Sequence, residues 1–76
     1  MQITVTIRYG NRDRDFRFGN EQKIRNLLGV LNESGMLALS AEMPEVKSLR
    51  RMEYLDIEKT FLEERIFSGD ILEVRG

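Results

Sequence analysis

Apolar and polar side chains alternate along residues 2–8 and again along residues 15–18. Because successive side chains of a strand point to opposite faces of a sheet, each alternation predicts a strand with one buried face. Residues 9–12 lie between them and include Gly10 and Asn11, which tolerate the positive φ of a tight turn. The pattern therefore predicts a hairpin. The side chains expected in the core are Ile3, Val5, Ile7, Phe16 and Phe18.

A different period follows, in which apolar residues recur three and four positions apart. This spacing predicts an amphipathic helix with a single apolar stripe. We expect Asn20 to cap its N-terminus, Glu21 to lie at the positive end of the helix dipole, and Gly35 to end it in a left-handed conformation. Gly29 inside the helix weakens it by about 1 kcal/mol relative to alanine. The stripe consists of Ile24, Leu27, Leu28 and Leu31.

The middle of the chain has a weaker pattern. Residues 36–45 are partly apolar without a decisive period, and we expect a loop with a short turn of helix there. Residues 46–51 predict a third strand whose register is open, because Val46 and Leu49 cannot both face the core without a bulge. We favour an inward Val46 and a partly exposed Leu49. A short strand or turn is expected around residues 54–55.

The closing segment contains two apolar anchors, Phe61 and Ile66, and then a Ser-Gly-Asp turn in which Gly69 is expected to have a positive φ. Leu72 and Val74 then alternate with polar residues, which predicts a final strand. The helix and third strand form the long crossover that parallel strands require. We therefore place the first and last strands side by side and parallel at the centre of the sheet.

The predicted order is two strands, one helix and further strands, the last of which is central in the sheet. This is the element order of the ubiquitin-like β-grasp. The expected fold class is α+β, a mixed four- to five-stranded sheet with one helix packed across one face. Residues 1–76 are expected to form a single domain. This length is near the lower limit for one core, where net stability is often about 3 to 5 kcal/mol.

The composition argues against most catalytic chemistry. The chain has no cysteine and no histidine, so nucleophilic systems that pair serine or cysteine with histidine are impossible in this polypeptide alone. The same absence excludes disulfides and argues against a structural zinc site. The longest apolar run, residues 27–31, is far shorter than the roughly 20 residues that span a bilayer. We expect a cytoplasmic protein that is not an enzyme and has no catalytic residues, cofactor or metal.

The net charge of −1 argues weakly against nucleic acid or an anionic membrane as the partner. The charge is unevenly distributed, because residues 1–25 hold six basic and three acidic side chains, or +3, and the remainder holds six basic and ten acidic ones, or −4. Four of the basic residues belong to the predicted hairpin and offer a basic edge to an acidic partner. The favoured alternative is solvated strand ends that resist edge-to-edge aggregation. These four are Arg8, Arg12, Arg14 and Arg17.

The chain resembles the YukD/EsaB family over its full length, on the pattern from Val46 to Val74. The resemblance is carried by the Phe61-Leu62 anchor, the isoleucine five residues after Phe61, and the ending Gly-Asp-x-Leu-Glu-Val. These are small cytosolic ubiquitin-like proteins associated with the type VII (WXG100/Ess) secretion systems of Gram-positive bacteria. The resemblance implies a non-catalytic protein-interaction module, accessory or regulatory, that is not conjugated to other proteins. Its implied partner is a cytosolic part of the secretion apparatus.

A second similarity covers the same ending in the β-grasp sulphur carriers of thiamine and molybdopterin synthesis. Those carriers use a flexible C-terminal Gly-Gly whose carboxylate is adenylated, whereas here Arg75 precedes Gly76. A bulky Arg75 should obstruct the narrow channel of an activating enzyme. The alternative function is therefore a sulphur carrier or ubiquitin-like modifier that acts through Gly76.

We place partner binding on the sheet face away from the helix, with an apolar centre and a charged rim. For the apolar members the alternative is ordinary scattered surface hydrophobics. Leu62 and Phe67 form a second candidate patch or peripheral core. The candidate partner-binding residues are Leu49, Ile71, Thr4, Thr6, Arg8, Lys47, Arg50 and Arg51.

Overall fold

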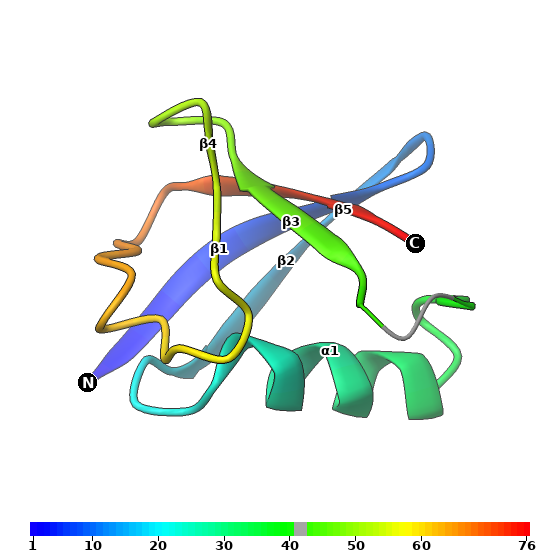
Figure 1. The fold of residues 1–76 in the computed structure, drawn as a ribbon, viewed down its shortest axis with the longest axis horizontal. Coiled ribbons are helices and arrows are strands. Elements are labelled where there is room, and N and C mark those ends of the chain that lie inside the picture. Colours follow the sequence, from blue (N-terminus) through cyan, green and yellow to red (C-terminus); the bar gives the residue numbers. More distant parts are fainter. Residues whose placement is uncertain (41–42) are drawn as a thin grey trace.

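A computed structural model describes residues 1–40 and 43–76 of the chain (Figure 1). Its strands form one five-stranded sheet in the order β2-β1-β5-β3-β4, and α1 crosses one face of that sheet (Figure 1). The mixed sheet with a helix across one face is therefore as predicted. The elements are β1 (Gln2–Tyr9), β2 (Arg12–Gly19), α1 (Ile24–Glu33), β3 (Glu45–Ser48), β4 (Glu53–Tyr54) and β5 (Ile71–Arg75).

The predicted hairpin is confirmed, and its second strand is longer than expected. β1 and β2 pair antiparallel along their whole length, from Gln2 opposite Gly19 to Tyr9 opposite Arg12. Gly10 has a φ of +61° in the turn between them. A two-residue turn fixes the register of the hairpin, so residues 12–14 are paired although they lack an apolar alternation.

The apolar stripe of α1 is buried as predicted, with each of its four side chains 7% exposed or less. Gly35 follows the helix with a φ of +83°, which confirms the predicted left-handed ending. Burial of this stripe against the sheet supplies most of the stability of so short a helix.

The predicted start of the helix at Asn20 is wrong. α1 begins at Ile24, and no side chain caps it. The amides of Ile24 and Arg25 donate instead to the carbonyl oxygens of Lys59 and Ile57, at 3.0 and 2.9 Å. Two of the unpaired donors of the first turn are thus satisfied by distant backbone, where a local side-chain cap would otherwise serve.

The segment before the helix is also held by distant backbone. Leu62 donates its amide to the carbonyl of Asn20 at 2.8 Å, and Phe61 donates to that of Gln22 at 3.3 Å. Glu21, predicted to lie at the helix dipole, lies outside the first turn of α1. It accepts a hydrogen bond from the ammonium group of Met1 at 3.4 Å. Residues 20–22 therefore belong to a connection between the hairpin and the closing segment.

The central strand pair is parallel, as predicted, with β1 and β5 in register from Thr6 opposite Ile71 to Tyr9 opposite Val74. β5 also pairs antiparallel with β3 on its other side. Gly69 has a φ of +93° just before β5, which confirms the predicted turn. β5 is therefore paired on both sides and completes the sheet.

The favoured register of the third strand is confirmed, since Val46 is buried and Leu49 is half-buried. β3 ends at Ser48, earlier than the predicted Arg51. The amides of Arg50 and Arg51 donate to side-chain oxygens of Asp70 and Ser48 instead of continuing the ladder. A turn then leads to the two residues of β4, in the region where a short strand or turn was expected.

The closing segment is organised around its two predicted anchors, because Phe61 and Ile66 are each 1% exposed. The ring of Phe61 packs on Phe18 with their centroids 4.5 Å apart. Thr60 and Glu63 form a reciprocal capping pair, in which each backbone amide donates to the other side chain at 2.9 and 3.0 Å. This pair fixes the turn that carries Phe61 into the core.

No turn of helix occurs in residues 36–40 or 43–45, so this expectation is wrong there. Its remaining part falls on residues 41–42, outside the described residues. The loop is held by long-range contacts: Leu37 is buried, and the Tyr9 hydroxyl donates to the carbonyl of Ala38 at 2.8 Å. These contacts fix the chain at the end of α1 beside the hairpin.

Candidate interaction surface

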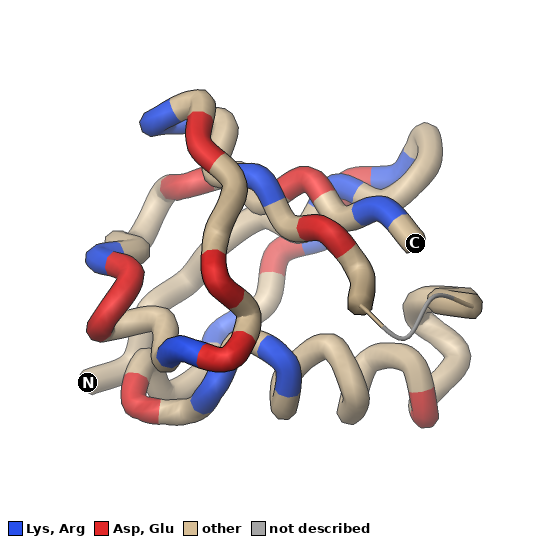
Figure 2. Tube along the Cα trace, in the orientation of Figure 1, with Lys and Arg blue, Asp and Glu red and all other residues tan. Residues whose placement is uncertain are grey.

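The sheet face opposite α1 carries a row of side chains that crosses all five strands. The register places one residue of each strand in this row, and the four charged residues among them alternate between acidic and basic. Opposite charges on neighbouring strands stabilise such pairs. Figure 2 shows the same intermixing of acidic and basic residues along the strands. From β2 to β4 the row is Asp13, Arg8, Glu73, Lys47 and Tyr54.

The ends of this row are fixed by direct contacts. Arg8 donates from Nε and Nη2 to the two carboxylate oxygens of Asp13 at 2.9 and 3.0 Å, the bidentate geometry that guanidinium favours. This hydrogen bond lowers the pKa of Asp13 and raises the pKa of Arg8. At the other end, Lys47 Nζ lies 5.5 Å from the centroid of the Tyr54 ring, within range of a cation–π contact. The row is therefore ordered at both edges of the sheet.

The predicted apolar centre lies next to this row. Thr6 and Ile71 are register partners on β1 and β5, and Leu49 donates its amide to the carbonyl of Ile71 at 2.9 Å. Thr4 precedes Thr6 on the same face of β1. The Thr6 hydroxyl donates to Asp15 at 2.6 Å, so it faces β2. The structure thus brings Thr4, Thr6, Leu49 and Ile71 together.

The two predicted arginines beyond β3 differ in their surroundings. Arg50 is exposed. Arg51 is half-buried, donates from Nη1 to the carbonyl of Glu64, and has Nη2 3.5 Å from the carboxylate of Glu53. Arg51 therefore ties the turn after β3 to the turn after Phe61, and its guanidinium is already engaged within the chain.

An open hollow of about 420 Å³ lies between these two turns. Arg50 and Arg51 line it together with Arg65 and Phe67. Phe67 is 58% exposed, so it is surface and not peripheral core. It was predicted as part of a separate patch, because nothing local in the sequence shows that the Ser-Gly-Asp turn carries it beside Arg50. Leu62 is also exposed and does not line this hollow.

A buried polar cluster positions this end of the face. Ser48 and Asp70 are 0% and 2% exposed, and the Ser48 hydroxyl donates to Asp70 Oδ2 at 2.7 Å. Asp70 Oδ1 accepts from the amides of Ile71 and Arg50, at 2.8 and 3.3 Å. The backbone amides of three candidate residues thus donate to Ser48 or Asp70; these residues are Arg50, Arg51 and Ile71. The sequence offered one sign of this cluster, because Ser48 is a polar residue two positions after Val46 and therefore on the inward face of the predicted strand.

No protein-family model and no curated protein matches the chain. Solved structures do. The ubiquitin-like domain of Dsk2 from Plasmodium falciparum matches over 100% of both chains, with a TM-score of 0.77 and 12% identity. The chain adopts the ubiquitin-like β-grasp fold.

Two similar ubiquitin-like domains come from mycobacterial EccD proteins. That of EccD5 from Mycobacterium xenopi has a TM-score of 0.69 and 19% identity, covering 99% of this chain and 93% of its own. That of EccD1, a type VII secretion system protein of Mycobacterium tuberculosis, has a TM-score of 0.69 and 16% identity, covering 100% of this chain and 99% of its own. At these identities the likeness shows the shared fold alone.

The four basic residues of the hairpin are divided between the two faces of this ubiquitin-like sheet. The register places Arg8 and Arg17 on the outer face. Arg12 and Arg14 lie opposite inward residues of β1 and face the helix side. The four arginines therefore share no single face, because residues at odd and even positions of β2 point to opposite faces. Arg12, Arg14 and Arg17 are exposed on this edge strand, in line with the favoured alternative of solvated strand ends.

Within the described residues of this ubiquitin-like chain, no three acidic side chains come close enough together to hold a metal ion. The helix α1 in this part of the chain is too short to cross a membrane. What the outer face does offer is a fixed array of charges around a small apolar area, which is suited to contact with another protein.

Proposed function

We propose that this chain is a non-catalytic protein-interaction module and an accessory or regulatory component of a Gram-positive type VII secretion system. The observation that carries the proposal is the outer sheet face. There the half-buried Leu49 and Ile71 lie beside an ordered row of alternating charges. An apolar centre with a polar rim is the usual anatomy of a protein interface.

The secretion context has two sources of support. One is the resemblance of residues 46–74 to the YukD/EsaB family. The other is the likeness in fold to the EccD5 domain and to the domain of EccD1, which is described as a type VII secretion system protein. The proposed partner is a cytosolic part of the secretion apparatus, and the proposed location of the chain is the cytoplasm.

The arrangement of the last residues supports a role without conjugation. Arg75 is paired in the sheet opposite Glu45, and its Nη2 lies 3.4 Å from Glu73 Oε1. The carbonyl of Gly76 accepts the amide of Ser40 at 3.0 Å. A sulphur carrier needs a glycine segment that is free to enter its activating enzyme in extended form, whereas Arg75 and Gly76 are both hydrogen-bonded within this domain.

The test is capture of partner proteins by the immobilised chain from a lysate of a Gram-positive bacterium with a type VII system. In the test variant, Lys47→Glu and Arg50→Glu reverse two charges of the outer face. Arg51 is left intact because its guanidinium joins two turns of the chain through Glu64 and Glu53. Lys59→Glu is the matched control. The backbone carbonyl of Lys59 accepts the amide of Ile24 in the first turn of α1, so this residue lies on the helix side.

We expect the wild type and the Lys59→Glu control to recover proteins of the secretion apparatus, identified by mass spectrometry, and the double variant to lose them. Equal recovery by all three would contradict the assignment of the face. Incubation with ATP and activating enzymes of the thiamine or molybdopterin type tests the alternative. A gain of mass at Gly76 would establish the sulphur-carrier function and overturn a role without conjugation.

A further inference from the structure

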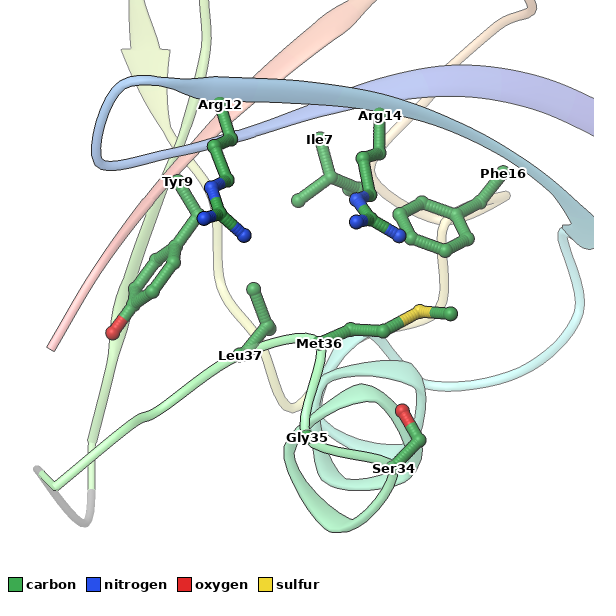
Figure 3. Close-up of a pocket in the computed structure, with 9 residues that line it drawn as sticks. All are labelled: Ile7, Tyr9, Arg12, Arg14, Phe16, Ser34, Gly35, Met36 and Leu37. Carbon is green, nitrogen blue, oxygen red and sulfur yellow. The ribbon is translucent and has the colours of Figure 1, made fainter.

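A second hollow lies on the helix side of the sheet, where the β1–β2 hairpin extends past the end of α1 (Figure 3). Its volume is about 130 Å³. Ile7, Phe16 and Leu37 give it an apolar interior, and Arg12 and Arg14 reach over it from β2 (Figure 3). We call it the Arg12–Arg14 pocket. It is close in size to a cavity of about 150 Å³ that holds a benzene ring, so it suits one side chain.

The two arginines occupy inward positions of the hairpin, opposite Ile7 and Tyr9. At such positions a longer helix would cover them, but α1 ends at Glu33. Both guanidinium groups therefore extend from β2 towards the chain after α1, as Figure 3 shows, and both side chains remain exposed to solvent.

Neither of these arginines has a carboxylate partner among residues 1–40 and 43–76. Other arginines of the chain do, including Arg8 with Asp13 and Arg25 with Glu58. Two cations at neighbouring inward positions of one strand repel each other, and solvent screens only part of this repulsion although both side chains are exposed. An anion between them would remove this repulsion.

The walls of the pocket are formed by the fold before any ligand binds. Gly35 turns the chain after α1 with a φ of +83°, and the amide of Leu37 donates back to the carbonyl of Leu31 at 3.2 Å. The Tyr9 hydroxyl donates to Ala38 at 2.8 Å and closes the far side. A site that is already shaped loses less conformational entropy on binding.

The pocket continues into a shallower hollow of about 410 Å³ towards the hairpin tip. Tyr9, Arg12 and Leu37 line both, and Gly10 borders the outer one. The two hollows together form a groove that can receive several residues of an extended chain and not a single ion alone.

We propose that the Arg12–Arg14 pocket binds an acidic segment of a partner protein. Carboxylates of the segment pair with the two guanidinium groups, and one apolar side chain enters between Ile7, Phe16 and Leu37. Nucleic acid is a poorer match, because only two basic side chains line the pocket and the net charge of the chain is −1. This surface is separate from the outer face and goes beyond the function proposed above.

The test is an NMR titration of the ¹⁵N-labelled full chain with the synthetic peptide acetyl-Glu-Asp-Leu-Asp-Glu-amide. We expect amide shifts at Arg12, Arg14 and Leu37, with a Kd of about 1 mM, typical of a short peptide with few contacts. The double variant Arg12→Gln/Arg14→Gln should raise the Kd by about tenfold or more, as loss of two charged hydrogen bonds implies. Arg17→Gln, on the same strand but the opposite face, should leave it unchanged.

Three further ligands sharpen the test. Replacing the acidic residues of the peptide by lysine should abolish the shifts, and replacing its leucine by serine should weaken binding. Inorganic phosphate should bind more weakly than the peptide. Equal binding by phosphate or by the serine peptide would overturn the role of the apolar interior. Equal binding by the double variant, shifts confined to the outer face, or tighter binding of a short single-stranded DNA would overturn the proposal itself.

The Lys47→Glu/Arg50→Glu variant separates the two proposals, because it alters the outer face and leaves the Arg12–Arg14 pocket intact. Retained peptide binding by this variant is the expected result. Loss of partner capture with retained peptide binding would locate the two activities on different faces, and loss of both would contradict the independence of the pocket.

Discussion

Replacing Asp70 by alanine is expected to remove the acceptor of three donors at once. The Ser48 hydroxyl donates to Oδ2, and the amides of Arg50 and Ile71 donate to Oδ1. Ser48 is 0% exposed and Asp70 is 2% exposed. Asp70 borders the hollow beside Arg50, so water can reach the two part-buried amides, but the Ser48 hydroxyl is enclosed and is left unpaired when the carboxylate is removed.

The cost follows from the burial of each donor. A buried hydroxyl without a partner costs about 1 to 3 kcal/mol, and loss of an ordinary hydrogen bond to each part-buried amide costs about 0.5 to 1.5 kcal/mol. The sum is about 2 to 6 kcal/mol, and we take about 3 kcal/mol as the expected loss of unfolding free energy. For a domain of this size that lowers the Tm by roughly 12 to 24 °C.

Thermal and urea unfolding followed by circular dichroism measure this loss. Asp70→Asn keeps one acceptor oxygen and should lose less. Asp15→Ala is the matched control, since it removes a carboxylate that accepts an exposed hydroxyl, that of Thr6, and should change little. In the double variant Ser48→Ala/Asp70→Ala the stranded hydroxyl is gone, so the combined loss should be smaller than the sum of the single losses.

A loss below about 0.5 kcal/mol for Asp70→Ala, or strictly additive effects in the double variant, would refute the reasoning. Either result would mean that the cluster is solvated or rearranged when the carboxylate is removed. It would also mean that Arg50 and Ile71 are positioned by the sheet alone.

Gly29→Ala should raise the unfolding free energy in urea by about 1 kcal/mol, since an added Cβ meets no atom within 4 Å; an unchanged or lower value would contradict this. Gly69→Val should cost about 1 to 2 kcal/mol in thermal melting, because φ is +93°; an unchanged Tm would argue against this strain. Hydrogen bonds from the Thr60 amide and hydroxyl lower the pKa of Glu63 from its ordinary 4.5. The ionised Glu63 carboxylate therefore stabilises the folded chain above pH 4.5, and this contribution is lost as the pH falls through the lower pKa of the folded state. Glu63→Gln should flatten the urea stability between about pH 5 and pH 3, and an unaltered slope would contradict the assignment.

Local patterns were sufficient where one element buries one continuous face. The alternation that ends in Leu72 and Val74 and the stripe from Ile24 to Leu31 correspond to buried faces of β5 and α1. The helix start was missed because the amides of Ile24 and Arg25 are satisfied by carbonyls more than thirty residues later in the chain. No local capping rule contains that information.

The sequence predicted which residues lie on the candidate face better than it predicted the contacts between them. Alternation placed Thr4, Thr6 and Lys47 on the side opposite the helix, which the register bears out. The same alternation cannot show which strands are neighbours, so the charge row and the approach of Phe67 to Arg50 were not foreseen. Arg51 was taken for a free rim residue because its contact with Glu64 joins two turns that are distant in sequence.

The placement of β1 and β5 has a mechanical consequence. Because these strands are parallel and adjacent, a tension applied to Met1 and Gly76 pulls them along their length in opposite directions. Their evenly spaced hydrogen bonds then bear the load together and must rupture nearly at once, unlike those of a hairpin that is peeled open one by one. The chain should therefore resist extraction by its two ends far more strongly than its modest size and core would imply.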